Sequence, residues 1–236
     1  KINRHGKPTR AQKKRYNARY NAIIKAQRSP EEQAVRNAKA HELRVARGHQ
    51  TQQKRAQAEL AKRELARRFL LPFIHRFDSK YKAGWFHKDL CQHLEQFLQD
   101  VVDQKSPRLM LFVPPRHGKS ITVSQHFSAW AHGKQPDFEF IQASYGDTLQ
   151  MDFSKKIQEM INDPEYQILF PGVTIPKNHQ AVARWHLAVD GKLTGGGHLA
   201  AGVGGPLTGR GAHIAMIDDP IKNAEEADSE TIRNSI

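Results

Sequence analysis

The stretch of sequence that decides the fold covers residues 108–120 and reads RLMLFVPPRHGKS. Its first six residues form a short, mostly apolar run that two prolines close, which is the pattern of a buried strand. Residues 120–131 then have the composition of a helix. A strand, a loop and a helix in this order predict an α/β domain.

The loop between this strand and helix carries the residue types that bind phosphate. Backbone N–H groups and a helix N-terminus attract negative charge, a lysine reaches the terminal phosphates, and a hydroxyl binds Mg²⁺. Val113 stands where a standard phosphate loop has its first glycine. The candidate nucleotide-binding residues are Pro115, Arg116, His117, Gly118, Lys119 and Ser120.

A second motif, residues 213–219, is an apolar strand that ends in two carboxylates and reads HIAMIDD. In P-loop ATPases such an acid lies beside the loop hydroxyl and holds the magnesium shell. We therefore expect Ser120 and Asp218 to bind Mg²⁺ and Asp219 to activate the attacking water as a general base. The alternative is a turn at the end of a strand, which Asp and Pro also favour.

The remaining pattern predicts strands that alternate with helices. A helix is expected over residues 86–102, a strand over 139–144, a helix over 148–161 and a strand over 212–217. Such alternation indicates an α/β fold with a mostly parallel sheet and helices on both faces. The nine glycines of residues 191–211 predict a loop-rich hairpin before the acidic strand.

The charge is concentrated at one end of the chain. The whole chain has 37 Lys and Arg and 24 Asp and Glu. Residues 1–68 hold 20 of these basic residues but only 5 of the acidic ones. Ser29, Pro30 and Glu32 predict a helix start, and the helix should continue to about Leu70. Residues 1–28 are expected to be flexible or weakly helical. We divide the chain into a basic helical arm, residues 1–70, and a P-loop ATPase domain, residues 71–236.

The function of the arm has two interpretations. Its charge attracts nucleic acid phosphates or an acidic protein surface. Equally, it is a solvated charged helix without a specific ligand. Composition excludes other classes of protein: the single Cys91 rules out an internal disulfide framework, and the longest apolar run, residues 109–113, is too short to cross a membrane.

Taken together, the motifs resemble the large terminase subunit of tailed bacteriophages. The resemblance covers residues 85–232 and rests on residues 114–120, 143–147, 207–212, 217–223 and 225–229. It implies an additive-strand P-loop ATPase that drives double-stranded DNA into a preformed capsid. In that family the phosphate loop deviates from the standard pattern and often carries an arginine. The family's acid pair is commonly Asp-Glu, whereas this chain has Asp219 as its second acid.

The resemblance also implies cofactors, partners and a location. ATP and Mg²⁺ are the expected cofactors, and double-stranded DNA, the phage portal and the small terminase subunit are the expected partners. A homo-oligomeric ring is expected on the procapsid, without a membrane, in the host bacterial cytoplasm and transiently at the portal. The arm would contact DNA, the small subunit or a neighbouring protomer. We expect the family's nuclease domain to lie outside these residues.

Two arginines are candidates to stabilise the transition state by neutralising charge on the transferred phosphoryl group. Arg116 lies inside the phosphate loop, and Arg210 matches the position of an arginine that serves a neighbouring subunit's nucleotide in similar motors. The resemblance further makes His87 or Gln92 a candidate to contact adenine, although a position on the helix surface is the preferred interpretation. Two other functions stay open: a P-loop helicase or remodelling ATPase, and a DNA-binding assembly fragment without ATPase activity in isolation.

Overall fold

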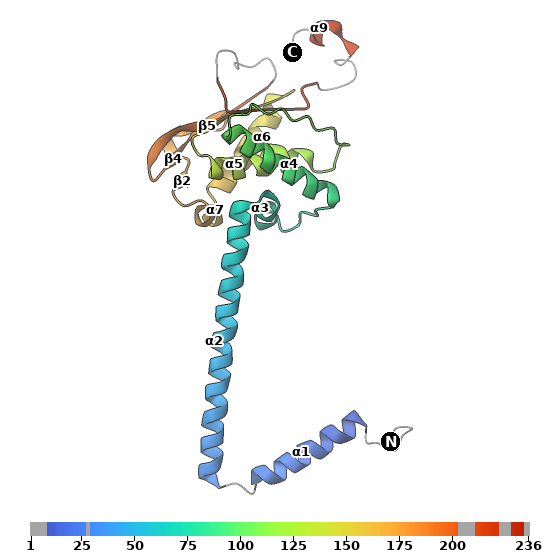
Figure 1. The fold of residues 1–236 in the computed structure, drawn as a ribbon, viewed down its shortest axis with the longest axis vertical. Coiled ribbons are helices and arrows are strands. Elements are labelled where there is room, and N and C mark those ends of the chain that lie inside the picture. Colours follow the sequence, from blue (N-terminus) through green and yellow to red (C-terminus); the bar gives the residue numbers. More distant parts are fainter. Residues whose placement is uncertain (1–8, 27–28, 203–210, 222–227, 234–236) are drawn as a thin grey trace. The chain divides into compact units, whose positions relative to one another are not determined.

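The computed structural model describes residues 9–26, 29–202, 211–221 and 228–233. In chain order (Figure 1), the elements are α1 (Arg10–Ala26), α2 (Pro30–Arg68), α3 (Leu70–Phe77), α4 (Trp85–Val102), the π-helix η1 (Ile121–Phe127), α5 (Ser128–Lys134), β1 (Glu139–Ser144), α6 (Asp147–Ile161), α7 (Pro164–Leu169), β2 (Val173–Thr174), the 3-10 helix η2 (Lys177–His179), β3 (Gln180–Ala181), β4 (Arg184–Val189), β5 (Lys192–Gly202), β6 (Ile214–Asp218) and α9 (Glu230–Arg233). No described helix is long and apolar enough to cross a membrane.

The chain divides into two compact units, Lys1–Glu59 and Leu60–Ile236. The second unit begins at Leu60, and Ala66 and Leu70 are part of its hydrophobic core. In the first unit, α2 begins as expected: the Ser29 hydroxyl accepts a hydrogen bond from the Glu32 N–H, and the Glu32 carboxylate accepts one from the Ser29 N–H. This capping box supplies partners for N–H groups that the helix leaves free.

The segment before α2 is more regular than the sequence predicts. Residues 10–26 form the helix α1, whose start has a similar reciprocal arrangement. The Gln12 side-chain oxygen accepts from the Thr9 N–H, and the Thr9 hydroxyl oxygen accepts from the Gln12 N–H. A Gln three residues after a Thr is the sequence signal for this cap.

The second unit is α/β, as predicted, but its sheet is mixed rather than mostly parallel. The strand order is β2-β4-β5-β1-β6, with β3 paired to β4. Strands β5, β1 and β6 are parallel to one another, whereas β2, β3 and β5 each pair antiparallel with β4. The direction changes because Asp190 and Gly191, both with positive φ, form a two-residue turn between β4 and β5. The loop-rich hairpin expected over residues 191–211 is not seen in the described part of that segment, because residues 192–202 form the single strand β5. Residues 203–210 lie outside the described residues.

Helices cover one face of the sheet. Phe140, Gln142 and Ser144 of β1 point to this face and are buried. Helical residues reach it through hydrogen bonds that join Ser124 to Asp218, Ser128 to Met216 and His132 to His198. On the opposite face the side chain of Ile217 is 70% exposed. The expected helical cover on both faces is therefore not seen in the described part of the chain.

One predicted strand is wrong. Residues 108–113 form no strand, and the apolar side chains of Met110 and Phe112 are 82% and 90% exposed. A strand needs a neighbouring strand to satisfy its N–H and C=O groups. Within the described residues, β6 pairs only with β1, and no strand pairs with residues 108–113. The apolar composition of this run therefore did not suffice to define a strand.

The other local predictions agree with the structure. The helix expected over residues 86–102 is α4, which buries Leu90, Leu94 and Leu98 against the core. The strand expected over 139–144 is β1, and the acidic strand is β6. The register of β1 and β6 sets Ser144 beside Asp218, so the carboxyl ends of these parallel strands meet at one edge of the sheet.

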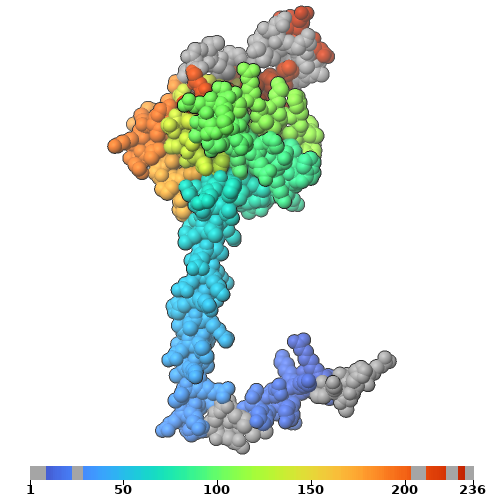
Figure 2. All heavy atoms as spheres, in the orientation of Figure 1, coloured from blue at the N-terminus to red at the C-terminus, as the bar shows by residue number. Residues whose placement is uncertain are grey.

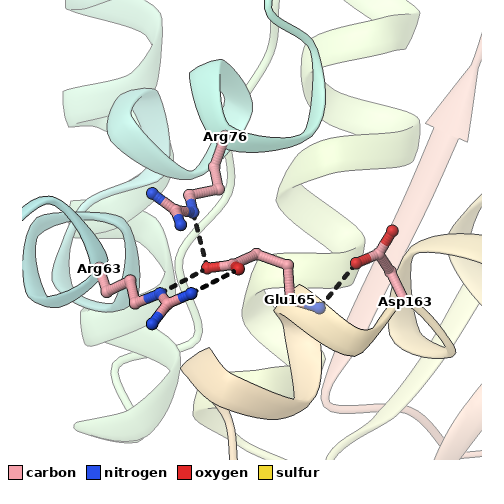
Figure 3. Close-up of polar contacts among 4 residues, drawn as sticks. All are labelled: Arg63, Arg76, Asp163 and Glu165. Carbon is pink, nitrogen blue, oxygen red and sulfur yellow. Dashed lines mark hydrogen bonds and ion pairs between the residues drawn. The ribbon is translucent and has the colours of Figure 1, made fainter. Parts of the chain in front are cut away.

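An ion-pair cluster ties the end of α2 to α3 and α7 (Figure 3). The Glu165 carboxylate accepts hydrogen bonds from the guanidinium groups of Arg63 and Arg76, at distances of 2.7 to 3.0 Å. Glu165 stands at the start of α7, where its N–H donates to the Asp163 carboxylate. Burial raises the pKa of Glu165, but the two arginines outweigh burial and leave that pKa lowered.

We predict that Glu165→Gln lowers the free energy of unfolding by about 1–3 kcal/mol, because two partly buried arginines lose their charged partner. The matched control is Glu64→Gln. Glu64 also bonds two arginines, Arg67 and Arg68, but in an exposed setting, so the control should leave stability nearly unchanged. Urea denaturation measures both variants. An equal effect of the two substitutions would contradict the structural role of Glu165.

A pair of buried histidines lies between α5 and the sheet. His132 Nε2 and His198 Nδ1 are 3.2 Å apart, and both side chains are buried. Burial lowers the pKa of His198 to about 3. Burial and the neighbouring His198 lower the pKa of His132 well below its ordinary value. The folded chain therefore keeps both rings neutral, whereas the unfolded chain protonates them at ordinary pKa values.

Because the unfolded state binds more protons, the free energy of unfolding should fall as the pH drops below about 6.5. We predict that His198→Gln removes up to about 1.4 kcal/mol per pH unit from this dependence between pH 6 and pH 4. Urea denaturation at a series of pH values measures the slope. The control His93→Gln changes an exposed histidine and should leave it unchanged. Equal slopes for His198→Gln and the unsubstituted chain would refute the assignment.

Candidate functional site

The residues that the sequence assigns to phosphate binding line one cavity. Its volume is about 340 Å³, and residues 113–121 and Asp219 form its wall. All six candidates from Pro115 to Ser120 lie on this wall. The structure therefore brings the loop and the second acid of the strand-end pair together.

The backbone of the loop is left-handed at two residues. Arg116 and Gly118 have φ values of 64° and 75°. Left-handed residues occur in the backbone turns that bind anions through successive N–H groups. A glycine adopts this backbone without cost, whereas an arginine is strained there. Strain of this kind is frequent at ligand-binding loops, and here it falls on a residue that lines the cavity.

A helical segment follows the loop directly. It continues through the π-helix η1 into α5. π-Helical turns are rare in proteins, but those that occur are often found at functional sites. The free N–H groups of the first helical turn add a partial positive charge beside the cavity.

Lys119 is the charged centre of the site. Its Nζ lies 2.5 Å from Asp219 Oδ1 and 3.1 Å from Asp218 Oδ1. Partial burial lowers the pKa of Lys119, but hydrogen bonds and charge from Asp219 and Asp218 outweigh it, so the pKa is raised. Lys119 is thus a firmly protonated cation held between two carboxylates.

The two carboxylates have different surroundings. The Asp218 side chain is 9% exposed, and its Oδ2 accepts a hydrogen bond of 2.9 Å from the Ser124 hydroxyl. The Asp219 side chain is 64% exposed, and its carbonyl accepts from the Tyr145 N–H. Asp218 is therefore fixed inside the fold, whereas Asp219 faces solvent at the cavity wall.

Ser124 is a site residue that the sequence analysis missed. The sequence predicts that Asp218 and Ser120 bind the same Mg²⁺, whereas the hydroxyl that donates a hydrogen bond to Asp218 belongs to Ser124, four residues later. Four residues bring a side chain back to nearly the same helix face. The spacing of four residues between Ser120 and Ser124 was the sequence signal that could have identified Ser124. Ser120 itself lines the cavity.

His87 contacts the phosphate loop. Its Nδ1 accepts a hydrogen bond from the Gly84 N–H, so its Nε2 carries the proton and donates to the His117 carbonyl at 3.0 Å. Beside it, the Tyr81 hydroxyl lies 2.6 Å from Thr122 Oγ1, which donates to the Gly118 carbonyl. Two consecutive loop carbonyls are therefore tied to side chains. This places His87 on the loop; its expected contact with adenine remains a prediction.

Of the two arginines that are candidates to stabilise the transition state, the structure describes one. Arg116 lines the cavity. Arg210 lies outside the described residues, as does the whole of the segment 222–227. Within the described part of the chain, no group of three or more His, Cys, Asp or Glu side chains is arranged to hold a metal ion.

The comparisons with known proteins agree with the motif analysis. Residues 110–236 match the family model described as terminase large subunit, T4likevirus-type, N-terminal. A search of curated proteins and a search of solved structures found no match. The matched residues make up more than half of the chain and include the loop, Lys119 and both acids. The chain therefore belongs to the family of T4-like terminase large subunits, of which it contains the N-terminal part.

Proposed function

We propose that this chain is the ATP-hydrolysing part of a phage DNA-packaging motor. Membership of the terminase large subunit family gives it a role in DNA packaging. The proposal of ATP hydrolysis rests on one observation: Lys119 lies between Asp218 and Asp219 at the wall of the loop cavity. A cation, a strained loop and two acids at one strand end form the set that phosphoryl transfer requires.

The residues of the cavity fit a nucleotide bound with magnesium. The volume falls within the usual range for small-molecule sites, and the loop backbone and Lys119 supply positive charge for a triphosphate. Mg²⁺ binds proteins through one or two oxygen ligands and completes its shell with phosphate and water. Ser120 and Asp218 would serve as those ligands. The bound ion would neutralise charge that develops on the transferred phosphoryl group.

Each side chain of the site has a distinct proposed task. Lys119 would exchange its carboxylate partners for phosphate oxygens, which would release Asp219. The exposed Asp219 carboxylate would then orient water and accept its proton. Arg116 or Arg210 would neutralise charge in the transition state. Which arginine acts, and whether it acts within its own subunit, stays open.

The proposal includes the partners that such a motor needs. Double-stranded DNA would be the substrate that is moved, and the portal and small terminase subunit would be the docking partners. A ring of copies on the procapsid would allow an arginine of one copy to reach its neighbour's nucleotide. The motor would work in the bacterial host's cytoplasm, transiently at the portal.

The test is ATP hydrolysis by the full chain, with and without double-stranded DNA. We predict that Lys119→Ala lowers turnover at least about 100-fold, because no other described side chain contacts both acids. The control is Lys105→Ala, since Lys105 also pairs with two aspartates, Asp100 and Asp103, but away from the cavity. It should retain full turnover.

Three outcomes are informative. Undiminished turnover in Lys119→Ala overturns the assignment of the loop. Nucleotide binding without turnover in the unsubstituted chain favours the alternative, a DNA-binding assembly fragment whose site another subunit or segment completes. Absence of nucleotide binding overturns the proposal.

A second prediction concerns His87, which holds the loop through the His117 carbonyl. His87→Ala should weaken nucleotide binding about tenfold, the effect of one lost hydrogen bond. His87→Gln keeps a donor and should restore most of the affinity. His93→Ala, on the same helix, is the matched control and should bind normally. Titration with a fluorescent ATP analogue measures all three variants, and equal affinity for His87→Ala and the control contradicts the role of His87.

A further inference from the structure

The first compact unit carries a large excess of positive charge. Residues 1–59 contain 16 Lys and Arg against 4 Glu and no Asp. Six of the basic residues belong to α1, which has no acidic residue. In a folded protein, such an excess requires counter-ions or an anionic partner.

The charges on α2 are not spread evenly around the helix. Successive residues turn by about 100° around the axis, so Arg36, Arg47 and Lys54 fall within about 20° of one another. The other basic residues between positions 33 and 58 flank them, at Lys39, Arg44 and Arg55. We call these six residues the basic face. Glu31 and Glu42 lie on the opposite side, about 140° or more from its centre, whereas Glu32 falls within the sector of the face, four residues before Arg36.

The basic face is exposed and unneutralised by the chain itself. Every described side chain from residue 34 to residue 58 is exposed. Figure 2 shows the surface of α2 that is turned toward the viewer. None of the six basic side chains forms an ion pair with another described residue. The face extends from Arg36 to Arg55, which spans about 28 Å at the α-helical rise.

The composition of the face distinguishes between possible partners. Between the basic residues stand the polar side chains of Asn37, Gln50 and Thr51, and Leu43 is the large apolar residue of this face. A membrane surface or a protein partner needs an apolar stripe to pack against. A row of cations with polar neighbours instead matches the regular phosphates of a nucleic acid backbone.

We propose that the basic face of α2 binds the phosphate backbone of double-stranded DNA without sequence preference. The binding requires no nucleotide, so it goes beyond the proposed ATPase. Its role rests on the proposed function: it would hold DNA on the motor while the loop site is between cycles of hydrolysis. Duplex DNA is the partner because the family packages DNA.

The test is fluorescence anisotropy of a labelled 30-base-pair duplex titrated with the full chain, without ATP, over a series of salt concentrations. The face variant is Arg36→Gln, Arg47→Gln and Lys54→Gln combined. The matched control is Ala38→Glu, Val45→Glu and Gln52→Glu combined, which removes the same net charge on the opposite side of α2. Circular dichroism checks that both variants keep their helix.

We expect the face variant to bind the duplex at least tenfold more weakly at 100 mM salt. The slope of the logarithm of the binding constant against the logarithm of the salt concentration should become less steep by about two to three. The control should bind within about threefold of the unsubstituted chain. Lys119→Ala should bind DNA normally, which separates this proposal from the ATPase. Equal losses in the two triple variants, no duplex binding, or equal competition by polyglutamate at matched charge would each overturn the proposal.

Discussion

The site depends on one electrostatic constraint: a lysine at the start of a helix is held between two carboxylates at the end of a strand. Lys119 and Asp219 are 100 positions apart in sequence, so their contact requires the sheet, the loop and the helix to be in place. A partly buried cation is costly without anionic partners, and a buried carboxylate is costly without a cation or donors. The fold satisfies both groups at once, and Ser124 supplies the remaining hydrogen bond to Asp218.

This constraint explains the order of elements around the cavity. Parallel pairing of β1 and β6 places Ser144 and Asp218 at the same sheet edge. His87 bonds the loop at the His117 carbonyl, and Tyr81 bonds Thr122, whose hydroxyl donates to the Gly118 carbonyl. In the proposed function, a phosphate that takes the lysine would free the acids for water and metal. The polar contacts to loop carbonyls would keep the loop in position during that exchange.

Local signals were read correctly from the sequence, whereas signals that depend on distant partners were not. The capping box at Ser29 and the apolar spacing of α4 act within a few residues, so both helices were predicted. Residues 108–113 have the composition of a strand but lack a pairing strand among the described residues. The direction of β4 depends on the turn at Asp190, which propensity alone did not reveal. His87 and Ser124 act through contacts that sequence spacing only hints at, and Arg210 lies outside the described residues.

We propose that a nucleotide binds the loop by taking Lys119 from its carboxylates. The most direct measurement is a crystal structure of the chain with a non-hydrolysable ATP analogue and Mg²⁺. We expect the analogue's phosphates to lie against residues 115–120, with Lys119 Nζ moved from Asp219 to a phosphate oxygen. A nucleotide bound elsewhere, or bound with the Lys119–Asp219 ion pair intact, would contradict it.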